Sequence, residues 1–423
     1  MRCRYRRGPD DRGEIMNHEE AVITGIGAVT AAGCGIARLA EVLGTSQVIA
    51  TEVDRSAGYH RAGSARTAVT ARHVDTSEWL SPLAGRRMSV GSRYAVSAAR
   101  MAVESAAVEP DILARASITN GTAYGAAEVT EKLLRQIFLD GPEAASPALF
   151  TESVANAPAA QVAISMGVKG PNVTITQRQA SPLLALAEGA AMVTTGRTPV
   201  GLVGAVDELN PLLHSVLDRF GALARPDQDG CEVARPFDAH RRGFLAGDGA
   251  AFLVLESRTA ARRRGARILC RVVTCGRGFD PDAPRAGWGR DPSVLSETVS
   301  RHLHATGISA EQIDLIVASG CGSPSADRIE ALVLRSVFED HPLPPLLAPK
   351  SVTGDHGGGF LAASVLAACG SPFGATPGFD EPDPELGVVP HRGGDPLSPR
   401  LTLITSFAAG GAVAWAVLGR SEE

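Results

Sequence analysis

The stretch TITQRQASPLLALAEGAAMVTTG, Thr174–Gly196, has the pattern of a strand that turns sharply into a helix, with Pro182 at the start of an apolar helical stripe. A turn of this kind holds the residue at its tip against the positive end of the helix dipole, where a thiol becomes a good nucleophile. The residue at this tip is Gln179, and a side-chain amide cannot be acylated. The pattern therefore predicts a nucleophile turn without a nucleophile.

The composition favours a globular protein of two lobes and excludes two classes of partner. A chain of 423 residues, 44% of them apolar, exceeds the ~250–300 residues at which a single core stops growing. Its formal charge of −5 comes without a basic stripe, so we expect no nucleic-acid partner. No run reaches the ~18 apolar residues of a membrane span, so we expect no membrane partner.

Neither the cysteines nor the glycines indicate a bound metal or cofactor. The seven cysteines are scattered, without a C-x-x-C pair or a grouping with histidine, and they indicate reduced thiols in a cytoplasmic protein. The glycine-rich run Gly25–Gly35 lacks the spacing of a dinucleotide-binding fingerprint. We therefore expect neither a metal nor a cofactor.

Alternating apolar runs and amphipathic patterns predict an α/β protein built in layers. The predicted strands are Ala21–Gly25, Ala116–Asn120, Val173–Thr176, Pro199–Val203, Ala250–Leu255, Ile268–Cys275, Leu315–Ser319 and Leu401–Ser406. The predicted helices are Ser92–Val108, Val129–Leu139, Ala157–Met166, Pro182–Thr195, Pro292–Thr306, Asp327–Phe338 and Phe360–Cys369. The charged residues 1–17 are not followed by the apolar run of a signal peptide, so we expect a disordered tail, with Met16 as an alternative start to Met1.

A weak internal repeat divides the rest of the chain into two halves. Val108–Gly121 resembles Ile308–Gly320, and each segment is a helix end, a turn and a buried strand that ends in glycine. A helix of similar sequence follows each of them. We therefore expect two copies of one α/β unit, residues 18–260 and 261–420, joined near Arg258–Arg267.

Five stretches together resemble the β-ketoacyl synthases, the condensing enzymes of fatty acid and polyketide synthesis that have the thiolase fold. These stretches are VITGIGAVTAAG (Val22–Gly33), GPNVTI (Gly170–Ile175), RPFDAHRRGFLAGDGAAFLVLE (Arg235–Glu256), PKSVTGDHGGG (Pro349–Gly359) and TSFAAGGAV (Thr405–Val413). They occur in the family's order along most of the chain. The resemblance implies a five-layered α-β-α-β-α fold made of two similar halves, in agreement with the internal repeat.

The catalytic positions of that family are replaced in this chain. The family's A-C-A-S turn, whose cysteine carries the acyl chain, reads Arg178-Gln179-Ala180-Ser181 here. Ser319 replaces the histidine of A-H-G-T-G-T, and Asp355 replaces the histidine of K-S-x-x-G-H, with His356 one residue later. Lys350 is retained. The resemblance implies that the two histidines polarise the malonyl thioester and its enolate, so these positions are predicted to be vestigial and no catalytic residue is expected.

With glutamine in place of the cysteine, the chain resembles the chain-length factor, or ketosynthase beta subunit, of type II polyketide synthases. The resemblance implies a non-catalytic subunit that forms a heterodimer with an active ketosynthase alpha subunit and controls the length of a polyketide or polyene chain. That chain is carried on the phosphopantetheine of an acyl carrier protein. Arg178 and the pair Ser181-Pro182 depart from the usual turn of such factors, which leaves both aromatic and polyene systems open.

The helical run Ala123–Phe138 lies where chain-length factors close the acyl tunnel of the partner. The resemblance places Ala127, Thr130 and Leu134 at the gating positions, at i, i+3 and i+7 on one helical face. Ordinary packing at an interface is the alternative for these three residues. Ala127 is small, which predicts a longer or differently shaped cavity.

Other interpretations fit the same residues. A malonyl-acyl-carrier-protein decarboxylase that makes an acetyl primer is the alternative function, because ketosynthase-like proteins with glutamine at the cysteine position can have that role. An active condensing enzyme would need Cys321 or Ser181 as its nucleophile, and Cys321 lacks a recognisable histidine partner. Gln179 can also be a structural amide that caps the helix behind it, and Asp355 a polar loop residue.

Overall fold

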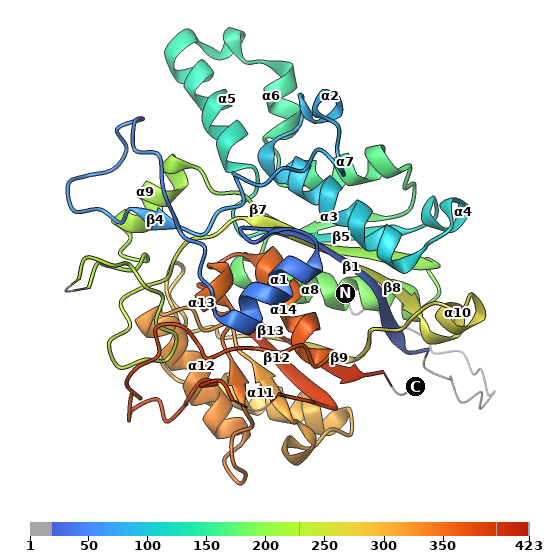
Figure 1. Ribbon diagram of the computed structural model, residues 1–423, viewed down its shortest axis with the longest axis vertical. Helices are drawn as coiled ribbons and strands as arrows, with labels where there is room; N and C mark the ends of the chain where they lie inside the picture. Colours follow the sequence, from blue (N-terminus) through green and yellow to red (C-terminus); the bar gives the residue numbers. More distant parts are fainter. Residues whose placement is uncertain (1–18, 228, 395, 422–423) are drawn as a thin grey trace, which may run out of the picture.

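A large mixed sheet organises the molecule (Figure 1). The computed structural model describes residues 19–227, 229–394 and 396–421, and the predicted disordered tail lies outside them. The strands are β1 (Ala21–Thr30), β2 (Gly33–Cys34), β3 (Thr51–Glu52), β4 (Thr67–Ala68), β5 (Ser117–Gly121), β6 (Asn172–Ile175), β7 (Val200–Asp207), β8 (Gly249–Ser257), β9 (Cys270–Phe279), β10 (Leu315–Val317), β11 (Leu346–Leu347), β12 (Leu401–Phe407) and β13 (Ala412–Arg420). β3 and β4 form a separate small sheet, and β2 pairs with β1.

The large sheet contains the same strand order twice. One part runs β6-β5-β7-β8-β1 and the other runs β11-β10-β12-β13-β9, so each part has its third, second, fourth, fifth and first strand in that order. β9 pairs with β1 over Ala21–Ile23 and joins the two parts. β5 and β10, which contain the strands of the internal repeat, hold the same place in their parts. The two similar halves expected from the sequence are confirmed.

Helices form three layers around the two parts of the sheet (Figure 1). They are α1 (Ile36–Thr45), α2 (Pro82–Gly85), α3 (Val90–Ala106), α4 (Pro110–Leu113), α5 (Ala127–Asp140), α6 (Pro147–Glu152), α7 (Ala157–Met166), α8 (Ser181–Thr194), α9 (Pro211–Arg219), α10 (Arg258–Arg263), α11 (Ser293–Ala305), α12 (Pro324–Val337), α13 (Lys350–Thr353) and α14 (Gly357–Ala368). α8 and α14 lie between the two parts, because both contact β8 of one and β13 of the other. α3 and α7 cover the outer face of one part, and α11 and α12 that of the other. The five-layered, thiolase-like fold is confirmed.

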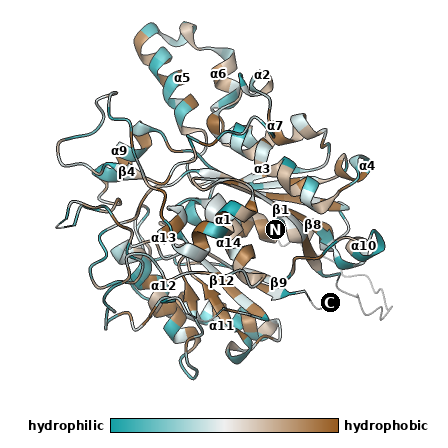
Figure 2. Ribbon diagram, viewed as in Figure 1, coloured by the Kyte–Doolittle hydropathy of each residue, from teal (hydrophilic) through white to brown (hydrophobic). Residues whose placement is uncertain are grey.

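The central layer is apolar on all sides because strands cover it from two directions. Every residue of α14 after Gly357 is buried. The outer helices have one buried face and one polar face, and α5 and α12 accordingly show both colours in Figure 2. This is the expected difference between a helix enclosed by two sheets and a helix at the surface.

Close packing of α3 explains why the first strand is longer than predicted. The predicted strand ends at Gly25, whereas β1 continues to Thr30. A Cβ at Gly25 or Gly27 would lie 2.3 or 2.2 Å from a backbone oxygen of α3. These glycines permit a close approach of α3 and do not end the strand.

All other predicted elements are present, with ends that differ by up to four residues. β13, α1 and α9 are absent from the predicted set, and the alanines of β13 carry little strand preference.

Candidate functional site

The turn that carries Gln179 has the geometry of a nucleophile turn. β6 ends at Ile175 and α8 begins at Ser181, so strand, turn and helix follow one another as predicted. Arg178 has a φ of 49°, a left-handed conformation that costs a residue with a side chain about 1–3 kcal/mol. The hydroxyl of Ser406 in β12 donates to the Gln179 carbonyl oxygen over 2.6 Å. This bond holds the turn against the other half of the fold.

The side chains of the turn do not cap α8. Gln179 Oε1 is buried without a hydrogen-bond partner among the described residues, and the N-cap of α8 is Ala180, which has no side-chain hydrogen bond. The interpretation of Gln179 as a helix cap is therefore wrong. The buried Ser181 hydroxyl donates to Thr122 O over 3.0 Å and accepts from the Gln177 N–H over 2.7 Å. It is a structural group and not a free nucleophile.

The retained lysine and the residue at the second histidine position form a buried ion pair. Lys350 Nζ lies 2.6 Å from Asp355 Oδ1, and the two side chains are 3% and 4% exposed. Burial opposes the charge of Lys350, but the Asp355 carboxylate and other acidic neighbours outweigh burial and hold the lysine pKa above its ordinary value. Asp355 is thus the counter-ion of Lys350.

His356 has a structural role at the start of α14. Its Nδ1 accepts from the Gly359 N–H over 3.3 Å and makes this residue the N-cap of the helix. Burial lowers the pKa of His356 to about 4, so the ring is neutral and Nδ1 can accept a hydrogen bond. A Cβ at Gly247 or Gly249 would lie 2.9 Å from ring carbons of His356. The imidazole therefore fills the space beside these two glycines and caps α14.

Ser319, at the first histidine position, is hydrogen-bonded to a buried carboxylate. Its N–H and its hydroxyl donate to Glu330 over 2.9 and 3.1 Å, and Thr405 Oγ1 donates to the same carboxylate over 2.6 Å. The Ser319 hydroxyl also accepts from the Phe407 N–H over 3.1 Å. Burial raises the pKa of Glu330 to about 7. These bonds join the end of β10 to β12 and α12, and they use both donors of Ser319.

A small pocket brings two of the three predicted vestigial positions together with the retained lysine. Gln179, Lys350 and Asp355 line it, beside Tyr124 and Arg178. Its free volume of about 10 Å³ is room for about one water molecule. Ligand sites for drug-sized molecules have volumes of ~300–1,000 Å³, so this pocket is far smaller than such sites.

Cys321 lies near the vestigial site, but its surroundings disfavour a nucleophile. The thiol is buried, and burial, with the nearby carboxylates of Asp355 and Asp327, raises its pKa well above the ordinary value. A cysteine reacts as the thiolate, the form that these surroundings oppose. Cys321 belongs instead to an apolar cluster with Leu209 and Leu223.

The three predicted gating residues lie on α5 in different surroundings. Ala127 is the first residue of the helix and is half-buried. Thr130 Oγ1 donates to Ala126 O over 2.6 Å and to Ser153 O over 3.0 Å, so its hydroxyl faces the end of α6. Leu134 is 43% exposed. Figure 1 shows α5 and α6 projecting together from the body of the molecule, and the gating role of the three residues stays a prediction.

Sequence reasoning missed a polar segment that begins at the end of β7. Asp207, the last residue of β7, is buried and lines the pocket. Its carboxylate accepts from Thr122 Oγ1 and from the N–H groups of Ala123 and Gly357, over 3.0, 2.7 and 2.9 Å. The signal that could identify it is the group Asp207, Glu208 and Asn210 at the end of an apolar strand, because strand ends of α/β proteins often carry functional residues.

Metal-binding groups and membrane spans were expected to be absent. In the part of the chain that the structure describes, no group of three or more His, Cys, Asp or Glu side chains is placed to hold a metal ion. Within the same ranges, no helix is long and apolar enough to cross a membrane. The described cysteines are free thiols.

Comparisons with known proteins agree on one family. Residues 18–261 match the β-ketoacyl synthase N-terminal domain, and residues 279–370 match its C-terminal domain. The chain is 26% identical over 410 residues to 3-oxoacyl-[acyl-carrier-protein] synthase 2 of Vibrio cholerae, across 94% of this chain and 98% of that protein. It is 31% identical over 304 residues to nodulation protein E of Rhizobium meliloti, across 70% of this chain and 73% of that protein. The solved structure of the ishigamide ketosynthase/chain length factor is similar with a TM-score of 0.85 and 30% identity, across 96% of this chain and 100% of that chain.

Proposed function

The chain belongs to the β-ketoacyl synthase family, and within it we propose that the protein is a chain-length factor, a subunit without condensing activity. It pairs with an active ketosynthase and forms the closed end of that partner's acyl tunnel. The pair extends a polyketide or polyene chain on the phosphopantetheine of an acyl carrier protein, and this subunit limits the length. We place the pair in the cytoplasm, where free cysteines stay reduced.

The observation that carries the proposal is the joint replacement of three catalytic positions inside an intact scaffold. Gln179 stands in the nucleophile turn, and an amide cannot form the acyl thioester. Ser319 is bonded to a buried glutamate, and Asp355 neutralises the retained lysine. Neither residue has a free proton for a developing enolate, which is the group that such a site must stabilise. The chain therefore keeps the shape of a condensing enzyme without its chemistry.

Sequence identity over the whole chain reflects the fold that this protein shares with its relatives. It does not depend on whether the few catalytic side chains are kept. The synthase of Vibrio cholerae and nodulation protein E are 26% and 31% identical to this chain, whereas condensation depends on a few side chains. The ishigamide protein, by its name, combines a ketosynthase with a chain length factor. It supports the proposal as a precedent for such a pair on this fold.

Exposed apolar side chains and an open sheet edge also support the pairing. β6 is the last strand of its part, so one side of its backbone faces no other strand of the described chain. Phe138 on α5, Phe150 on α6 and Ile164 on α7 are 80%, 62% and 75% exposed. Large exposed apolar side chains and open strand edges mark protein interfaces. We expect the ketosynthase to cover them through an obligate interface of ~2,000 Å² or more.

α5 provides the length limit in this proposal. Leu134 lies on the same helix as Phe138, and both side chains are exposed. In the pair, Ala127, Thr130 and Leu134 meet the distal end of the growing chain. The small side chain of Ala127 leaves room for further extension before the chain reaches the end of the tunnel.

The test compares this chain alone with the chain paired to its ketosynthase. Each is incubated with malonyl-acyl carrier protein, and carbon dioxide release, chain extension and product length are measured. We expect a 1:1 pair that extends chains only while the ketosynthase retains its cysteine, and no rapid carbon dioxide release by this chain alone. Rapid release without the partner would support a malonyl-acyl-carrier-protein decarboxylase instead. Elution of this chain as a monomer, separate from the ketosynthase, in size-exclusion chromatography would contradict the pairing.

A further inference from the structure

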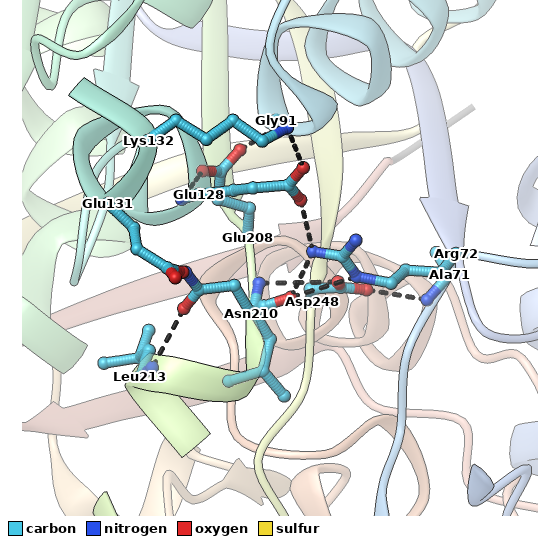
Figure 3. Close-up of polar contacts among 11 residues, drawn as sticks. Ala71, Arg72, Gly91, Glu128, Glu131, Lys132, Glu208, Asn210, Leu213 and Asp248 are labelled. Carbon is cyan, nitrogen blue, oxygen red and sulfur yellow. Dashed lines mark hydrogen bonds and ion pairs between the residues drawn. The ribbon is translucent and has the colours of Figure 1, made fainter. Parts of the chain in front are cut away.

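Polar contacts hold α5 in place more than apolar packing does. Of its 14 residues, Val129 and Leu133 are the buried ones, whereas α3 buries most of its length. The N-cap residue of α5, Ala126, makes no side-chain hydrogen bond to the first turn. A helix that buries so little apolar surface needs other contacts to keep one position. Figure 3 shows these contacts, which come from Arg72 and from the segment after β7.

Glu208 supplies the cap that α5 lacks. Its side chain is buried, and Oε1 accepts from the N–H of Glu128, the second residue of α5, over 2.7 Å. The other oxygen, Oε2, accepts from the Gly91 N–H in the first turn of α3 over 2.9 Å. One carboxylate therefore binds the first turns of two helices, where N–H groups have no partner within the helix and negative charge is favoured.

Asn210 makes a second link, one turn further along α5. Its Nδ2 donates to Glu131 Oε2 over 2.7 Å. Its Oδ1 accepts from the Leu213 N–H over 2.9 Å and caps α9. Tyr59 also donates to Glu131 through its hydroxyl. One amide group thus connects α5 to α9.

Arg72 joins α5 to the backbone between Glu208 and Asn210. Its Nη2 donates to Glu128 Oε2 over 2.8 Å and to Leu209 O over 2.6 Å (Figure 3). The buried Asp248 carboxylate accepts from the N–H of the preceding residue, Ala71, over 2.6 Å. This bond fixes the backbone next to Arg72, and the Arg72 guanidinium then bridges α5 and the segment Asp207–Asn210.

The other end of the same segment belongs to the vestigial pocket. Asp207 lines that pocket and accepts from Ala123 and Gly357. Each residue of Asp207–Asn210 therefore makes a side-chain or carbonyl contact outside the segment. These four residues connect the pocket to α5, and three of them do so through polar side chains.

We propose that Glu208 and Asn210 are positioning residues for α5, and that the segment Asp207–Asn210 sets the place of this helix relative to the pocket. The inference rests on the proposed function in one respect: where α5 closes the acyl tunnel, its place decides the length of the product. Loss of either contact lets α5 open locally and broadens the range of product lengths. The apolar core and α14 are unaffected.

The test uses two variants in the assembled pair with the ketosynthase. Glu208→Gln keeps the shape of the side chain but presents an NH₂ group to one of the two N–H donors. Asn210→Ser keeps an N-cap for α9 and removes the donor to Glu131. Lys132→Ala is the matched control, because the pair of Lys132 with Glu128 is an exposed contact on the same helix and such pairs contribute little. Hydrogen–deuterium exchange of α5 and α14 is measured together with product length.

We expect amide exchange in α5 to become about fivefold faster in both variants, the factor for one lost hydrogen bond. Exchange in α14, and all exchange in Lys132→Ala, should match the parental pair, and product lengths should broaden at a near-parental initial rate. Unchanged exchange of α5 in both variants would overturn the positioning role. Faster exchange with unchanged product length would support that role and contradict α5 as the gate. Asn210→Ser leaves Glu208 intact, so it tests the proposal even where Glu208→Gln does not fold.

Discussion

The ammonium of Lys350 and the carboxylate of Asp355 lie 2.6 Å apart in a site that excludes solvent from both side chains. By the resemblance to condensing enzymes, the lysine is the retained member of the catalytic set and the aspartate replaces a histidine. The two charges balance each other, so the lysine is stable in the interior without a substrate. Removal of one partner leaves an isolated buried charge.

Asp355→Ala should destabilise the protein by about 3–5 kcal/mol, because Lys350 then stays buried without a counter-ion. The double variant Lys350→Met, Asp355→Leu should unfold near the parental urea concentration, because an apolar pair avoids the desolvation of both charges. Urea unfolding of the three proteins measures both effects. Equal midpoints for the parental protein and Asp355→Ala would contradict the buried ion pair.

Gln179→Cys alone should not create a condensing enzyme. The new thiol gains a helix N-terminus, but Ser319 and Asp355 stay bound to Glu330 and Lys350 and offer no donor to an enolate. Extension of radiolabelled malonyl-acyl carrier protein should therefore stay at background when the cysteine of the partner has been removed. Extension above background by this single variant would show that the site still supports the chemistry.

Ala127→Phe should shorten the product of the assembled pair. A ring placed at the closed end of the tunnel overpacks it by ~1–3 kcal/mol, which disfavours the last extension ~5- to 150-fold and leaves earlier ones unaffected. Lys132→Phe adds the same ring on the exposed side of α5 and serves as the control, with parental product length expected. Mass spectrometry measures the length of the products. An unchanged length in Ala127→Phe would show that α5 does not limit the product and only packs at the interface.

The stability of the protein in acid should depend on His356. Its folded-state pKa of about 4 lies below the ordinary ~6.5, because burial disfavours the charged ring. As the pH falls through this interval the unfolded chain takes up a proton that the folded chain does not, so the free energy of unfolding decreases by about 1.4 kcal/mol per unit of pKa difference. Above the ordinary pKa this contribution to stability is fully present.

His356→Asn keeps a good N-cap for α14 and removes the imidazole. Its free energy of unfolding should therefore decrease less between neutral pH and about pH 4.5 than that of the parental protein. Urea midpoints at the two pH values provide the measurement. The same decrease in both proteins would show that another group, and not His356, carries the acid sensitivity.

Motifs made of neighbouring residues explain why the fold could be predicted from the sequence and why the replaced positions could be located in it. The turn around Gln179 and the run that leads from Lys350 to Asp355 are each readable within a few residues. The orientation of the Gln179 side chain is not a local property. Its turn is held by Ser406, 227 residues later in the chain. Gln179 lines the pocket, and its buried Oε1 has no hydrogen-bond partner among the described residues. The helix-cap interpretation failed for this reason.

The anchors of α5 could not be predicted for the same physical reason. Glu208 binds Glu128 and Gly91, which precede it by 80 and 117 residues, and no local pattern pairs these positions. A polar run after an apolar strand is also typical of ordinary turns. The contacts exist because the sheet places β7 beside β5, so the ends of both strands meet the first turn of α5.

The repeated strand order of the two halves bears on how such a protein arises in evolution. Gln179, Ser319 and Asp355 all lie in turns and loops between the regular strands and long helices. Their exchange therefore leaves both copies of the topology intact. After a gene duplication, one descendant can lose its chemistry in a few substitutions while its surface still recognises the other descendant. In the role proposed here, natural selection then acts on the shape that the protein gives to a shared cavity, and no longer on a reaction of its own.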